Sequence, residues 1–129
     1  MKITSKFNGA LRFDTEVRGH VITMDNPVES GGTDSGPTPP EFLVASLTSC
    51  VGIYAVFFCN KHGISPEGME VTADYEKASA PARVGKINIT VSLPAGIPAD
   101  KNEAFMKTIK HCMVHNTLEI APEVTMTLV

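Results

Sequence analysis

The sequence has little charge, and the charge that it has is not clustered. Among 129 residues there are 11 Lys and Arg and 14 Asp and Glu, which leaves a net charge of −3. The basic residues form no stripe, so the sequence argues against a nucleic-acid partner. Low-complexity runs, internal repeats and linkers are also missing. The composition is that of an ordinary globular protein, and we expect a single domain over residues 1–129.

The N-terminal stretch MKITSKFNGALRF lacks the apolar segment of a secretory signal. We therefore expect a cytoplasmic protein. The three cysteines, Cys50, Cys59 and Cys112, form neither a CxxC pair nor a disulfide-scaffold spacing. Because thiols stay reduced in the cytosol, any disulfide here is expected to be transient, catalytic or sensing.

The first third of the chain predicts strands over 2–8, 10–17 and 18–25, the first two joined at the hairpin-forming pair Asn8-Gly9. The Gly- and Pro-rich stretch NPVESGGTDSGPTPP then predicts a loop, and long ordered loops in small domains are often functional. A helix is expected from Pro39 to about residue 61. Its start is indicated by the capping-box spacing TPPE, and its end by Gly63.

Period-2 alternation predicts two further strands, over 69–77 and 85–93, each with one buried face. The segment 99–111 fits a helix with Phe105, Met106 and Ile109 directed inward. A short helix is expected over 113–120, and a closing strand over 123–129.

Residues 42–60, FLVASLTSCVGIYAVFFCN, carry no charge at all. Such a run is long enough to cross a bilayer. However, it contains several polar residues, and half-buried strands flank it on both sides. A helix that is apolar all round is buried all round, and a chain of this length cannot easily wrap one alone. We therefore expect an intertwined homodimer and no membrane partner.

Taken alone, Cys50 is expected to be inert, because an apolar site suppresses the thiolate. Cys112 lies at a predicted helix start, where unpaired N–H groups favour a thiolate, although a core role is equally open. Cys59 falls on a different side of the helix from Cys50 and is interpreted as core packing. A zinc site from Cys50, Cys112 and His115 would need a fourth ligand that the sequence does not offer, and we expect no cofactor or metal.

Two motifs bear on these alternatives. The stretch GGTDSGPTPPEFLVASLTSC resembles the pattern GG.D.GPTP.E.LLASL..C of the OsmC-like branch of the OsmC/Ohr superfamily. The later stretch KHCMVHNTLEIAPEVTMTL resembles the second cysteine motif of that superfamily,..C..S.TL. The two cysteines stand about sixty residues apart, as in the family, and the resemblance covers nearly the whole chain.

The resemblance implies an α+β fold with antiparallel sheets wrapped around long central helices. It also implies an intertwined homodimer with an active site at the dimer interface. Better-characterised relatives are thiol peroxidases that reduce organic hydroperoxides. By that analogy Cys50 is the peroxidatic cysteine and Cys112 the resolving one. A thiolate attacked by peroxide becomes a sulfenic acid, a second thiol converts it to a disulfide, and a dithiol reductant, lipoyl or thioredoxin-like, resets the pair.

Family peroxidases activate the thiol with an arginine held by a glutamate. Arg18 is the best candidate here, with Arg12 and Arg83 as alternatives. Glu41 is the candidate glutamate, but it stands nine residues before the cysteine instead of ten, and its capping-box position explains it without catalysis.

Two more residues depart from the family pattern. Met113 stands where many relatives have proline, and His115 stands where they have serine. His111 or His115 is a candidate to tune the thiol of Cys112. Besides the peroxidase, the sequence leaves open a non-catalytic ligand-binding or redox-sensing protein on the same scaffold, and a structural protein with inert thiols.

Overall fold

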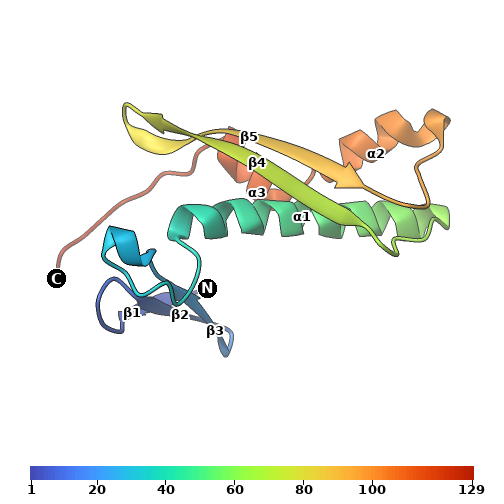
Figure 1. Cartoon of the computed structure of the whole chain (residues 1–129). Helices are drawn as coiled ribbons and strands as arrows, with labels where there is room; N and C mark the ends of the chain where they lie inside the picture. Colours follow the sequence, from blue (N-terminus) through green and yellow to red (C-terminus); the bar gives the residue numbers. More distant parts are fainter. The chain divides into compact units, whose positions relative to one another are not determined.

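The computed structural model describes all 129 residues (Figure 1). The chain forms two compact units, residues 1–44 and 45–129, and the long helix α1 begins in the first unit and continues through the second. Along the chain the elements are β1 (Thr4–Phe7), β2 (Phe13–Val17), β3 (His20–Met24), η1 (Val28–Ser30), α1 (Pro39–His62), β4 (Glu70–Ser79), β5 (Ala82–Ser92), η2 (Ala99–Lys101), α2 (Asn102–Ile109) and α3 (Met113–Glu119).

The first unit contains an antiparallel sheet in the order β1-β2-β3. The predicted first hairpin is confirmed, but its turn is longer than a two-residue Asn8-Gly9 connection. The turn is closed by hydrogen bonds from the Asn8 N–H to the Arg12 carbonyl and from the Arg12 N–H to the Gly9 carbonyl, both 2.9 Å. Positive φ falls on Gly9 (86°) and Ala10 (47°), one position later than a turn centred on Asn8-Gly9 requires. The second strand therefore begins only at Phe13.

The placement of Arg18 at the start of the third strand is wrong. Val17 pairs with His20, so Arg18 and Gly19 form a two-residue turn between β2 and β3. Their φ values, 52° and 82°, are those of a type I′ turn, whose twist suits antiparallel strands. The Arg18 side chain is exposed.

The Gly- and Pro-rich segment after β3 is an ordered loop organised by a buried carboxylate. Asp25 is 1% exposed and accepts hydrogen bonds from the N–H groups of Asn26, Thr33 and Ser35 and from the Thr33 hydroxyl. The Thr33 hydroxyl is the main cause of a strongly lowered pKa at Asp25, and the three N–H donors add to it. A Cβ on Gly32 would lie 1.9 Å from the Asn26 carbonyl oxygen, so the loop requires glycine there.

The predicted ends of α1 are confirmed. The Glu41 carboxylate accepts a hydrogen bond from the Thr38 N–H at 2.8 Å, and the Glu41 N–H donates to the Thr38 hydroxyl at 3.4 Å. These two bonds are the reciprocal pair of a capping box. At the other end Gly63 has a φ of 65°, and the Ile64 N–H donates to the Cys59 carbonyl. This arrangement satisfies a terminal carbonyl and ends the helix.

In the second unit the β4–β5 hairpin lies along α1 (Figure 1). One face of α1 is buried, and its apolar residues recur at helical spacing. The core cluster consists of Leu47, Val51, Ala55, Phe58, Phe105, Ile109 and Cys112. From the sheet, Val71, Ile87, Ile89 and Val91 pack against this cluster, which confirms the alternation predicted for both strands. The hairpin extends to Ser79 and Ala82, further than the period-2 pattern indicated.

The predicted helix over 99–111 is shorter than expected, with a 3-10 turn followed by α2. Phe105 and Ile109 are buried as predicted, but Met106 is 50% exposed. Phe105 and Ile109 are four residues apart and lie on one face of the helix. Met106 points about 100° away from Phe105 around the helix axis and therefore faces solvent. The short helix after Cys112 is confirmed as α3.

The predicted closing strand over 123–129 is wrong for this chain. Residues after Glu119 have no regular secondary structure and are exposed, although Val124, Met126 and Leu128 alternate with polar residues. A strand needs hydrogen bonds from a neighbouring strand, and no segment of the chain supplies them.

Candidate active site

Cys50 and Cys112 meet in the second unit. Cys50 lies in α1 and packs against the core cluster that contains Cys112, while Cys112 is the N-cap of α3. The Cys50 thiol lies near enough to Cys112 to raise the pKa of that thiol, and neither cysteine is in a disulfide. Two cysteines far apart in the sequence are thus adjacent within one chain, with one partly exposed and the other fully buried.

The surroundings of Cys112 work against ionisation. Burial is the main cause of its raised pKa, and the nearby Cys50 thiol raises it further. The His115 N–H at the start of α3 donates to the Cys112 sulfur at 3.4 Å and lowers the pKa, but this effect is smaller. The helix start therefore acts as predicted in direction, and desolvation outweighs it.

Cys59 takes no part in this pair. It is 0% exposed, and burial raises its pKa. The interpretation of Cys59 as core packing is confirmed. An apolar buried thiol of this kind is unreactive.

The structure gives each arginine a definite setting. Arg12 forms an ion pair with Asp14, with its Nε 3.0 Å from Oδ1. Arg83, the one arginine of the second unit, is exposed and donates to the Pro81 carbonyl at 3.1 Å. Both alternatives to Arg18 are therefore engaged in contacts of their own. Arg18 itself is exposed and lies in the turn between β2 and β3. The Glu41 carboxylate caps α1.

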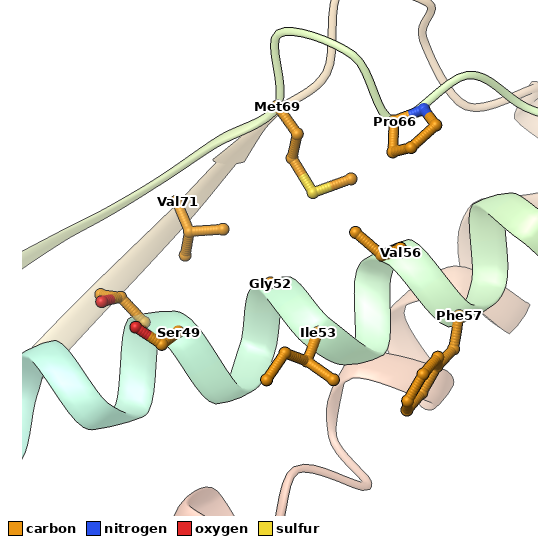
Figure 2. A pocket seen from close by; sticks show the side chains of 9 residues that line it. Ser49, Gly52, Ile53, Val56, Phe57, Pro66, Met69 and Val71 are labelled. Carbon is orange, nitrogen blue, oxygen red and sulfur yellow. The ribbon is translucent and has the colours of Figure 1, made fainter. Parts of the chain in front are cut away.

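A long apolar groove runs along α1 in the second unit (Figure 2). Its volume is about 700 Å³, and it is lined by Thr48, Ser49, Gly52, Ile53, Val56, Phe57, Pro66, Met69 and Val71. Val71 lies near the start of β4 and Met69 directly precedes that strand, whereas Ile53 and Phe57 belong to the helix (Figure 2). Ile53 is 53% and Phe57 58% exposed, so this face of α1 is not covered by the chain itself.

By length and composition α1 could cross a membrane. Its most apolar window has a mean hydropathy of 2.1, and 33% of that window is buried within the chain. A core helix of a protein outside the membrane passes the same test. One face of α1 is thus apolar and exposed in the chain.

Titratable side chains gather in no set that could hold a metal. The chain has no group of three or more His, Cys, Asp or Glu side chains placed to bind an ion. The zinc alternative built on Cys50, Cys112 and His115 therefore has no structural support. What the site can offer is thiol chemistry between two adjacent sulfurs.

Comparison with solved structures identifies the fold. The chain is 21% identical to a Psychrobacter arcticus protein assigned to osmotic stress and detoxification responses, with a TM-score of 0.82 and coverage of 91% of this chain and 87% of that one. An OsmC-like protein from Mycoplasma pneumoniae is 20% identical, with a TM-score of 0.77 and coverage of 93% and 87%. The organic hydroperoxide resistance protein OhrB of Bacillus subtilis is 15% identical, with a TM-score of 0.60 and coverage of 93% and 90%. None of the curated proteins compared with the chain matches it in sequence.

These likenesses define the class: an α+β protein with antiparallel sheets and helices in the arrangement of OsmC-like structures. The sequence profile of the OsmC-like protein family matches residues 32–127, which include both cysteines. The chain belongs to the OsmC-like family.

Proposed function

We propose that the protein is a cysteine-based thiol peroxidase that reduces organic hydroperoxides. The observation that carries this proposal is the proximity of the Cys50 and Cys112 thiols. Family membership supports it, since the Bacillus subtilis relative is named for organic hydroperoxide resistance.

Exposure supports the division of roles. Cys50 is partly exposed, whereas Cys112 is 0% exposed, so a peroxide reaches Cys50 first. The Cys50 thiolate attacks the terminal peroxide oxygen, the O–O bond breaks, and the alcohol leaves. Cys112 then attacks the resulting sulfenic sulfur, and the S–O bond breaks with release of water. An external dithiol, lipoyl or thioredoxin-like, reduces the disulfide and returns both thiols.

The proposed cation near Cys50 is Arg18, because the other two arginines have partners of their own. Its left-handed φ of 52° makes Arg18→Asn the suitable test variant, since asparagine tolerates that conformation. This variant is expected to lose tenfold or more in kcat/KM for peroxide, while Arg18→Lys retains most activity. For Glu41 we expect helix capping to be the larger role, so Glu41→Gln should change stability more than activity.

We further propose that a second copy of the chain covers the exposed face of α1, in a homodimer. The groove along α1 and the unpaired C-terminal alternation both expose apolar side chains that a copy would bury. Exposed apolar patches of this kind mark interfaces. In such a dimer the second copy, and not a membrane, covers the apolar face of α1. We also expect a cytoplasmic location, because thiols stay reduced in the cytosol and all three cysteines are free.

A redox sensor is the second candidate function. It is favoured by the raised pKa of Cys112 and by the absence of a free arginine in the second unit. A sensor would form the same disulfide once but would turn over slowly. The same scaffold without disulfide chemistry would be a ligand-binding protein.

Consumption of cumene hydroperoxide with dithiothreitol tests the proposal. Wild type should turn over, Cys50→Ser should be inactive, and Cys112→Ser should stall after one equivalent. Cys59→Ala is the matched control, because Cys59 is buried away from the pair and the variant should keep wild-type turnover. If wild type consumes one equivalent and then stops despite reductant, the sensor is the better account. If it consumes none, both redox functions are wrong.

A further inference from the structure

The thiol of Cys112 has a structural role that disulfide formation would disturb. Cys112 is the N-cap of α3, and its sulfur accepts a hydrogen bond from the His115 N–H at 3.4 Å. An N-cap side chain satisfies one of the backbone N–H groups that the first turn of a helix leaves without a partner. Because sulfur is a weak acceptor, this cap is easily lost.

Helix α3 has few tertiary supports. It is 7 residues long, and none of its residues is buried. Val114 is partly buried and packs against the core cluster. The His115 Nε2 lies 3.5 Å from Oε1 of Glu119, but the Glu119 side chain is 65% exposed, and exposed ion pairs add little stability. Since helices of this length are marginal on their own, α3 depends on its cap more than a long or buried helix does.

A disulfide with Cys50 would draw the Cys112 sulfur out of its capping position. Two sulfurs that are not bonded stay at least about 3.5 Å apart, whereas a disulfide bond is about 2.05 Å long. The two sulfurs must therefore approach each other by about 1.5 Å or more. Cys50 lies in the middle of the 24-residue helix α1, next to the buried Val51. Because α1 is long and packed while α3 is short, we expect Cys112 to make the movement and to lose the hydrogen bond.

We propose that disulfide formation between Cys50 and Cys112 removes the cap of α3 and loosens this helix, which makes α3 a redox-sensitive element. The oxidised state rests on the thiol chemistry of the proposed function, whereas the capping role of Cys112 does not. Residues after Glu119 are exposed and have no regular secondary structure, so α3 can loosen without unfolding any element beyond it. A redox sensor needs a local change of this kind, because another molecule must detect its disulfide.

The oxidation balances in atoms and electrons. With an organic hydroperoxide it passes through the Cys50 sulfenic acid and yields one S–S bond, one alcohol and one water. With diamide, the N=N bond accepts the two protons and two electrons that the thiols lose, which gives a hydrazine and the same S–S bond. A dithiol breaks the disulfide in two exchange steps and returns both thiols, and the cap forms again.

Amide hydrogen exchange in peptides that cover α3 tests the proposal on the whole chain. Reduced wild type is compared with wild type oxidised by diamide, in which peptide mapping verifies the disulfide between Cys50 and Cys112. Loss of an N-cap shifts a local opening equilibrium about fivefold, so exchange in α3 should become about fivefold faster and should recover after dithiothreitol. Exchange in α2, which packs Phe105 and Ile109 into the same core cluster, should stay unchanged.

Substitutions at the two cysteines separate capping from oxidation. Cys112→Ala removes the acceptor and should give the reduced protein the fast α3 exchange of the oxidised state. Cys112→Ser supplies a preferred N-cap residue and should keep the slow exchange with or without diamide. Cys50→Ser is the matched control for the oxidant, because it keeps the cap and cannot form the disulfide. Faster exchange in both α2 and α3 of Cys112→Ala would indicate lost core packing and would overturn the capping role.

Equal α3 exchange in reduced and disulfide-bonded wild type would overturn the proposal, and so would a chain in which diamide forms no disulfide between Cys50 and Cys112. Faster α3 exchange after diamide, in a protein that consumes no cumene hydroperoxide, would keep the redox-sensitive element and remove the peroxidase. Turnover of cumene hydroperoxide with unchanged α3 exchange in the disulfide form would keep the peroxidase and remove the redox-sensitive element.

Discussion

Replacing Phe57 with serine should weaken self-association of the chain, because Phe57 lies on the uncovered face of α1 and is 58% exposed. A phenylalanine contributes about 200 Å² of burial, so roughly 115 Å² of Phe57 is available to a second copy. At about 25 cal/mol per Å² this area is worth about 3 kcal/mol. A two-fold interface contains the residue twice, which gives an upper bound of about 6 kcal/mol.

The assay is sedimentation velocity over a range of protein concentrations. Wild type should sediment as a dimer at micromolar concentration, and Phe57→Ser should raise the dissociation constant by more than about a hundredfold. Phe57→Leu keeps most of the apolar area and should remain largely dimeric. The reasoning is refuted if wild type is monomeric, or if Phe57→Ser dimerises as tightly as wild type.

Three further predictions concern stability and follow from single contacts. Thr38→Ala removes the hydroxyl that accepts the Glu41 N–H, one of the two bonds of the capping box, and should lower the free energy of unfolding by about 1 kcal/mol in urea; an unchanged midpoint would mean that this bond adds nothing to stability. Leu47→Ala leaves a cavity in the core beneath α1 and should cost about 2–5 kcal/mol in the same assay, whereas Ile53→Ala on the exposed face should cost the folded monomer much less. Because the pKa of Asp25 is lowered in the folded protein, its stabilisation is present above the unfolded value of about 4 and is lost as pH falls. Asp25→Asn should therefore flatten the loss of stability below pH about 4, and an identical acid profile would contradict this role.

The features predicted correctly depend on local chemistry. The ends of α1 follow from Thr38, Glu41 and Gly63, all within a few residues of the helix ends that they determine. The β4–β5 hairpin follows from alternation, since each strand packs one face against α1. Such patterns need no knowledge of distant residues.

The failures involve information outside the local sequence. The alternation over 123–129 is that of a strand, but no segment of the chain pairs with it. At Cys112 the helix start was visible in the sequence, whereas the burial that outweighs it depends on α1 and α2.

Disulfide mapping after one equivalent of cumene hydroperoxide tests the central claim most directly. Reduced protein is treated, alkylated and analysed by mass spectrometry. The account predicts a disulfide between Cys50 and Cys112, with Cys59 still free, and a sulfenic acid trapped at Cys50 in Cys112→Ser. Three unmodified thiols, or a sulfenic acid on Cys112 instead of Cys50, would contradict it.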